Sequence, residues 1–197
     1  MEIRECANSW LAREDAIAHH CVLPGLLIIP TTSALAMAPL SIRPNPSWYQ
    51  VSAPNRALMA AAVHTWEDAS LSSQYVQQAL AQPDVELDVL VSAYRYYFYK
   101  NDAPMTLNIA LRLLDRIRQQ EQWSPDWEAL KPILQAGLHD PVVRLYLSAY
   151  GASGLALARL GSIDSAQTIA EQVQELGAKE FGADILLSVL NPPPEED

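Results

Sequence analysis

Few residues in this chain have the types and spacing that metal binding requires. Two histidines and a cysteine are adjacent at residues 19–21, and Cys6 lies upstream of them. Zinc sites usually combine a close cysteine pair with further ligands at a regular spacing, and the sequence has neither here. His64 and His139 are isolated, which is typical of structural or capping histidines. We therefore predict no metal site.

Motifs for nucleophilic catalysis or phosphate binding are also missing from the sequence. The segment GASG, residues 151–154, has no lysine after it and falls within a predicted helix, so we interpret it as a packing device. Four carboxylates in predicted helices have no evident inward-facing partner: Glu128, Asp140, Asp164 and Glu171. Charges on helices usually form a solvated face. We expect a protein that is not an enzyme and uses no cofactor.

Composition excludes two classes of partner. The chain has 197 residues, of which 13 are Lys or Arg and 23 are Asp or Glu, giving a formal net charge of -10. Nucleic-acid binding needs clustered basic residues that neutralise phosphates, and an acidic chain is repelled by anionic lipid. No apolar run reaches the roughly 18 residues that a membrane span needs. We expect no nucleic-acid and no membrane binding.

Cysteine usage indicates a reducing compartment. Cys6 and Cys21 are too few, and too close to the N-terminus, to build a disulfide scaffold. Residues 21–38 are similar to the apolar core and cleavage site of a secretory signal, but Pro24 and Pro30 interrupt them and the preceding segment is acidic. We predict a cytoplasmic protein. A secreted or periplasmic location is the alternative if residues 21–38 act as a signal.

The chain divides into three parts by composition and helical periodicity. Residues 1–53 contain one possible short helix and then a stretch rich in Pro and Ser, which indicates a poorly ordered extension. Residues 54–190 show helical periodicity almost throughout, and residues 191–197 form an acidic tail without folding signals. The predicted helices are 54–68, 70–82, 85–100, 104–121, 125–137, 141–160, 163–176 and 179–190.

Capping residues and glycines mark the helix ends. Ser124 and Asp140 each precede a proline, a pattern typical of an N-cap followed by Pro at the first helical position. Gly161 is placed to end one helix, Ser162 to cap the next, and Gly177 to end that one. Residues 158–177 therefore predict the end of one helix, a tight turn and a second helix.

Small residues around this turn follow a pattern that resembles the tetratricopeptide repeat. Gly154, Gly161 and Ala166 match that family's small residue in the first helix, its turn glycine and its small residue at the helix crossing. Upstream copies place Ala93 and then Ala60 where Gly154 sits. The resemblance implies antiparallel helical hairpins in a short right-handed superhelix. An irregular helical bundle is the alternative, and both architectures are all-α.

The segment YRYYFYK, residues 94–100, is the main candidate for binding. Such a run surrounds a whole helix, so its side chains cannot all face one core. In the family that the chain resembles, the first helix of each unit lines the concave surface. The resemblance therefore implies a partner-binding groove, with Tyr96 packed inward, formed by Tyr94, Arg95, Tyr97, Phe98 and Arg159. Packing of the aromatic residues against the N-terminal extension is the alternative.

Arginines of the predicted helix 104–121 form a second feature. Arg112, Arg116 and Arg118 lie close together in an otherwise acidic chain. They can meet an acidic partner, or they can pair with Asp115, Glu121 and neighbouring acidic helices, which we favour.

Together these features favour a non-enzymatic protein interaction module, such as an adaptor, chaperone or assembly factor. Its groove is expected mainly within residues 85–160, and its partner is a protein or peptide segment. Two alternatives stay open. One is a helical-bundle enzyme or small-ligand binder with a closed apolar pocket. The other is a self-associating protein, with a homodimer as its simplest form.

Overall fold

The computed structural model describes residues 51–178 and 181–190, and the structural statements below concern these ranges. The chain divides into residues 1–43 and 44–197, and the described ranges belong to the second unit. The cysteine-histidine cluster, the signal-like segment, the short N-terminal helix and the acidic tail all lie outside the described residues. Predictions about them stay predictions.

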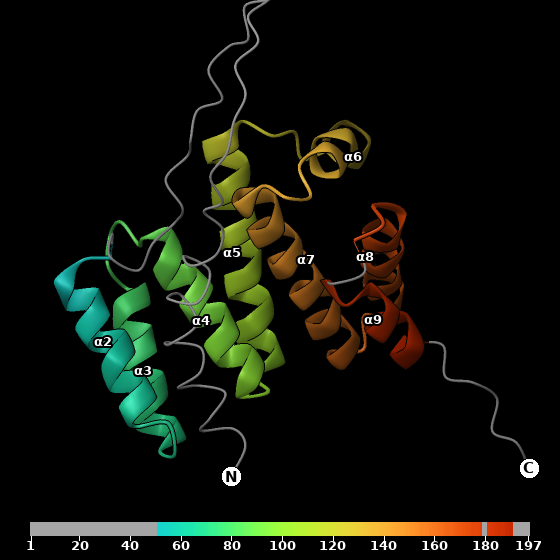
Figure 1. Cartoon of the computed structure of the whole chain (residues 1–197). Coiled ribbons are helices and arrows are strands. Elements are labelled where there is room, and N and C mark those ends of the chain that lie inside the picture. The colour runs from blue at the N-terminus through green and yellow to red at the C-terminus, as the bar shows by residue number, and fades with distance from the viewer. Residues whose placement is uncertain (1–50, 179–180, 191–197) are drawn as a thin grey trace, which may run out of the picture. The chain divides into compact units, whose positions relative to one another are not determined.

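Every regular element in the described ranges is a helix, which confirms the all-α prediction (Figure 1). None of these helices is both long and apolar enough to span a bilayer. They are α2 (Ala53–His64), α3 (Ala69–Leu80), α4 (Leu87–Tyr99), α5 (Ala103–Glu121), α6 (Trp127–Ala136), α7 (Pro141–Arg159), α8 (Ile163–Glu175) and α9 (Ala183–Leu190).

Aspartate side chains begin several of these helices. Asp140 caps α7 as predicted, because its Oδ1 accepts hydrogen bonds from the backbone N–H groups of Val142 at 2.7 Å and Val143 at 3.3 Å. The predicted cap at Ser124 is wrong, because Asp126 occupies that position in α6. Ser124 instead accepts a hydrogen bond from the Asp126 backbone N–H in the turn before the helix.

Glycines end helices where the sequence places them. Gly161 and Gly177 have φ values of +80° and +70°, the left-handed conformation that glycine adopts without a Cβ penalty. Ser162 occupies the N-cap position of α8, but its side chain makes no capping hydrogen bond. The last helix begins at Ala183 rather than at Lys179, directly after Gly182 with φ +82°.

Consecutive helices pack in pairs, and the pairs contact one another in order. The closest packing is between α4 and α5, α5 and α7, α2 and α3, and α7 and α8. The first helices of successive pairs also meet, since α2 contacts α4 and α4 contacts α7. Helix α6 separates α5 from α7 in the sequence, yet those two helices pack directly on each other (Figure 1). It is therefore an insert between two hairpins.

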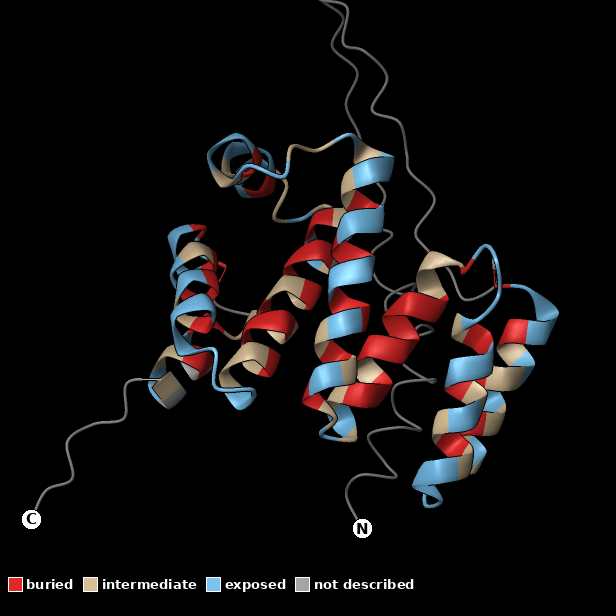
Figure 2. Ribbon diagram, turned by 180° about the vertical axis from the view of Figure 1, so that it is seen from behind, coloured by how far each residue is buried: buried red, intermediate tan, exposed pale blue. Residues whose placement is uncertain are grey.

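Small residues allow the closest helix contacts in the buried interior (Figure 2). A Cβ at Gly154 would lie 2.8 Å from Leu186 Cδ2 and 2.9 Å from Ile169 Cγ2. Ala166 is fully buried nearby, as is Ala93 in α4. Gly154, Ala166 and Ala93 thus lie at buried helix contacts, and their role as the packing residues of a repeat stays a prediction.

The packing residue proposed for the first hairpin is wrong. Ala60 is exposed on α2, whereas Ala62 is completely buried. The Ser72 hydroxyl of α3 donates a hydrogen bond of 2.8 Å to the Ala62 carbonyl, which marks the close contact between the two helices. The close-contact residue of α2 is therefore Ala62, two residues after the one we expected.

The packed region begins before the predicted boundary at Pro54. Val51 is 2% exposed and belongs to the core. The Ser52 backbone N–H donates to Glu86 Oε1 at 3.0 Å, and Asn55 Nδ2 donates to Glu86 Oε2 at 2.6 Å. Burial acts to raise the pKa of Glu86, but hydrogen bonding from Ser52, from its own backbone and from Asn55 outweighs it and lowers the pKa to about 2. Glu86 therefore ties the start of α2 to the start of α4.

Candidate functional site

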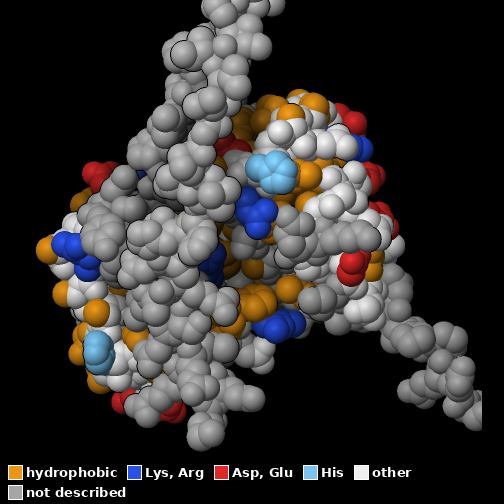
Figure 3. All heavy atoms as spheres, viewed as in Figure 1, with side chains coloured by type: hydrophobic (Ala, Val, Ile, Leu, Met, Phe, Trp, Pro, Cys, Tyr) orange, Lys and Arg blue, Asp and Glu red, His pale blue; other side chains and the backbone are white. Residues whose placement is uncertain are grey.

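An open hollow of about 220 Å³ lies between α4, α7 and the short segment before α9. On the face shown in Figure 3, hydrophobic atoms gather near α7 with Lys or Arg side chains among them. We call the hollow the α4/α7 groove. Its lining residues are Tyr94, Arg95, Phe98, Tyr99, Ser148, Gly151, Ala152, Leu155, Phe181 and Gly182.

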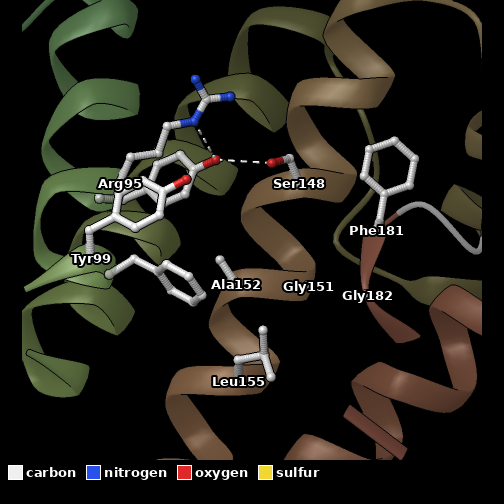
Figure 4. A pocket seen from close by; sticks show the side chains of 10 residues that line it. Arg95, Tyr99, Ser148, Gly151, Ala152, Leu155, Phe181 and Gly182 are labelled. Carbon is white, nitrogen blue, oxygen red and sulfur yellow. Dashed lines mark hydrogen bonds between the residues drawn. The ribbon is translucent and has the colours of Figure 1, made fainter. Parts of the chain in front are cut away.

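The floor of the α4/α7 groove consists of small residues of α7. Gly151 and Ala152 lie between the α4 side chains and Phe181 (Figure 4). A Cβ at Gly151 would lie 2.4 Å from the Phe181 carbonyl oxygen, so only glycine lets that backbone come so close. Gly151 therefore leaves the space over α7 unfilled and lets the Phe181 backbone lie close to this helix.

The wall formed by α4 carries a short hydrogen-bonded chain. Tyr94 is 3% exposed, and its hydroxyl lies 3.0 Å from Ser148 Oγ of α7. Arg95 Nε donates to the same hydroxyl at 3.2 Å, as the dashed lines in Figure 4 mark. Since the hydroxyl oxygen accepts from Arg95, its own proton can point to Ser148. These two hydrogen bonds connect α4 to α7 beside the groove.

Arginines pack against the aromatic walls. Arg159 Cζ lies 5.2 Å from the centroid of the Phe98 ring, and Arg144 Cζ lies 5.3 Å from that of Phe181. Arg95 Cζ lies 5.8 Å from the Tyr94 centroid. These distances are typical of cation–π contacts. Among the described residues that line the groove, none is acidic, although the chain as a whole has a net charge of -10.

Most of the predicted binding residues lie together, but one does not. Tyr94, Arg95 and Phe98 line the groove, and Arg159 packs against Phe98. The placement of Tyr97 there is wrong, because Tyr97 is 2% exposed and is not among the lining residues. The reason is that α2, α3, α5 and α7 all pack on α4, which leaves it little free surface.

Tyr96 and Tyr97 are core residues. Tyr96 packs inward as expected, with its ring 5.4 Å from Trp66 and 5.0 Å from Tyr97 in edge-on contacts. Burial raises the pKa of Tyr96. The Tyr97 hydroxyl is buried without a hydrogen-bond partner among the described residues.

Sequence reasoning missed the residues on the far side of the groove. Ser148, Leu155 and Phe181 carried no signal of their own, because they meet only when α7 packs beside α4 and α9. The GASG segment did carry a signal, since two glycines spaced three residues apart put two close contacts on one helix. We read that signal as packing alone.

A second aromatic group holds α6 against its neighbours. We call it the α6 cluster, and it comprises Trp123, Trp127, Tyr146 and Tyr150. Trp127 stacks on Tyr150 with ring centroids 6.1 Å apart, and Tyr150 stacks on Tyr146 at 6.0 Å. The Tyr150 hydroxyl donates to Gln172 of α8. Burial, followed by the neighbouring Tyr146, raises the pKa of Tyr150 to about 12.

The arginines of α5 line a separate hollow of about 280 Å³. Arg118 Nη2 pairs with Asp115 Oδ1 at 2.7 Å, as we expected. Arg112 and Arg116 make no ion pair within the described ranges and line this hollow together with Asp115 and Gln119. The acidic side chain among them sets this hollow apart from the α4/α7 groove.

Other ligand chemistry finds little support in the described part of the chain. It contains no group of three or more His, Cys, Asp or Glu residues placed to hold a metal ion. His64 Nδ1 lies 2.8 Å from the Ala60 carbonyl oxygen one helical turn earlier, as in a capping histidine.

Comparisons with known proteins give no match for this chain, whether against family models, curated proteins or solved structures.

Proposed function

We propose that this protein is a non-enzymatic interaction module that holds a segment of a partner protein in the α4/α7 groove. The observation that carries the proposal is the groove itself, in which aromatic walls with packed arginines stand on either side of a floor of small residues. Aromatic residues and arginine dominate the binding energy of protein interfaces. Such a module serves as an adaptor, a chaperone or an assembly factor.

The order of helix contacts supports a tetratricopeptide-like arrangement within this proposal. In stacked helical hairpins, each pair buries its apolar face against the next, and the first helices of the pairs line one surface. Here α2, α4, α7 and α9 contact one another in sequence, and the groove lies between two of them. The insert α6 interrupts the array without separating α5 from α7.

The size of the groove favours a peptide segment over a small-molecule ligand. Ligand and cofactor sites usually enclose about 300–1,000 Å³ and bury most of the ligand. The α4/α7 groove measures about 220 Å³ and opens to the surface, so it suits one or two side chains of a longer segment. Both this groove and the hollow beside α5 open to the surface.

Selection from a displayed library of random linear peptides tests the proposal. The full chain is the bait, and Ala152→Phe, which fills the floor of the groove, is the blocked variant. Ala129→Phe is the matched control, since Ala129 is exposed on α6 and lies outside the groove. Circular dichroism checks that both variants keep their helical content.

We expect peptides that bind the wild-type chain and the Ala129→Phe variant but not the Ala152→Phe variant. Failure to enrich any peptide, or equal binding to both variants, would overturn the proposal.

A further inference from the structure

We infer that the segment held in the α4/α7 groove is acidic and inserts one aromatic side chain between Phe98 and Phe181, onto the floor made by Gly151 and Ala152. This inference rests on the proposed function and names the chemistry of the partner. It follows from the shape of the floor, the nature of the walls and the charge at the rim.

The floor and walls suit a flat, bulky side chain. Gly151 and Ala152 offer almost no side chain to fill the space between the walls. Aromatic rings attract one another in edge-on or offset contacts at centroid distances of roughly 4.5–7 Å, beyond the gain from burial. A single aromatic side chain on this floor meets a phenylalanine on either side, whereas a small side chain leaves the hollow unfilled.

An arginine at the edge of the groove favours an acidic residue next to the inserted aromatic side chain. Arg159 is exposed, and its contact among the described residues is with the Phe98 ring. A guanidinium that lies over a ring keeps its N–H groups at the edge, where they can bind a carboxylate in two parallel hydrogen bonds. An acidic residue beside the inserted aromatic side chain can therefore bind the Arg159 guanidinium next to Phe98.

The hollow beside α5 is a weaker candidate for the same segment. Its arginines, Arg112 and Arg116, make no ion pair within the described ranges, but Asp115 lines the same hollow and repels a carboxylate. It also has no aromatic lining residue. It serves here as the control surface.

The sequences of the selected peptides give the first test. We expect enriched peptides to share one Trp, Tyr or Phe with Asp or Glu close to it. Enriched peptides that depend on the groove but lack the aromatic residue, or that are neutral or basic, would overturn this inference and leave the proposed function standing. No enrichment at all would overturn the proposed function itself.

Charge reversal gives the second test. Binding of the most enriched peptide, labelled with fluorescein, is measured by anisotropy at low salt. We expect Arg159→Glu to weaken binding by about tenfold or more, because it places a repulsive charge beside the peptide carboxylate. The matched reversal Arg116→Glu on α5 should change it by less than about twofold, because distant charges are screened.

A swapped peptide completes the test. When lysine replaces the acidic residues of the same peptide, its binding should fall for the wild-type chain and recover for Arg159→Glu. Equal effects of the two charge reversals on binding, or no recovery of binding by the lysine peptide, would show that Arg159 does not contact the charged residue of the peptide.

Discussion

Helix α7 faces aromatic residues on two opposite sides. One side is filled by stacked rings, and the other leaves an open groove. On one side, Tyr146 and Tyr150 stack with the tryptophans of the α6 cluster. On the other side, Gly151 and Ala152 form the floor of the α4/α7 groove. At 3.6 residues per turn these two sets lie on opposite faces of the helix.

The difference shows that aromatic side chains leave a hollow here where small residues lie between the walls. In the α6 cluster, large rings from α7 reach the tryptophans directly and fill the space between the helices. In the groove, the walls come from α4 and from Phe181. Helix α7 places Gly151 and Ala152 between them, with Ser148 and Leu155 about one turn to either side. The first arrangement is packed, and the second leaves an open hollow, which we propose as the binding site.

Truncating one aromatic residue from each side should give the largest difference in stability between the two sides. Tyr146 is 2% exposed, so Tyr146→Ala should lower the free energy of unfolding by about 3–5 kcal/mol through lost contacts and a cavity. Phe98 is half-buried at the groove rim, so Phe98→Ala should cost clearly less while abolishing peptide binding. Urea denaturation gives both values, and equal costs would contradict the division of roles.

The two glycines of α7 offer a finer comparison. Gly154→Ala should lower the free energy of unfolding by about 1–3 kcal/mol, because the new Cβ lies under 3 Å from Leu186 and Ile169 side chains. Gly151→Ala should instead push the Phe181 backbone away and reduce peptide binding. Denaturation together with anisotropy separates these effects. Unchanged binding by Gly151→Ala would show that Phe181 is not a wall of the site.

Removing single hydroxyls should distinguish a groove tyrosine from a core tyrosine. Tyr94→Phe loses hydrogen bonds with Ser148 and Arg95, so it should cost about 1 kcal/mol of unfolding free energy. Tyr97→Phe removes a buried hydroxyl that has no partner among the described residues, so it should be neutral or stabilising by up to about 1 kcal/mol. The reverse order in thermal or urea denaturation would contradict these assignments.

Acid should weaken a third region, the joint between α2 and α4, and so provide a reference outside both faces of α7. The pKa of Glu86 is about 2 in the folded chain, below its ordinary value of 4.5. Its hydrogen bonds therefore stabilise the fold fully above about pH 4.5, and that contribution is lost as the pH falls toward 2.

We expect Glu86→Gln to lower stability at pH 7 by on the order of 1 kcal/mol and to flatten the pH dependence between pH 4.5 and 2. Denaturation across this range measures both. An unchanged acid profile in Glu86→Gln would assign the dependence to other carboxylates.

Much of the helical architecture follows from local signals in the sequence. Asp140 before a proline, and the glycines at 161 and 177, mark helix ends that need no tertiary information. Ser124 shows the limit of such signals, because Asp126 two residues later offers an equally good cap and takes the position. Ala60 shows a similar limit, since a run of alanines in α2 leaves the helix register undetermined.

The groove could be predicted only in part, because its two walls come from distant segments. Phe98 and Arg159 were predicted from an aromatic run and a resemblance, and the structure brings them into contact. Tyr97 was misplaced because the sequence does not show that four other helices pack on α4. Phe181 was missed because its approach depends on Gly151, which is 30 residues earlier in the chain.

The most direct test of the groove is a map of the amide chemical shifts that change when the most enriched peptide binds to isotope-labelled full-length protein. We predict that the largest changes fall on Phe98, Ser148, Gly151 and Ala152. Changes confined to the α6 cluster, or to Arg112 and Arg116 on α5, would contradict the proposal that the small-residue floor of α7 is the binding surface.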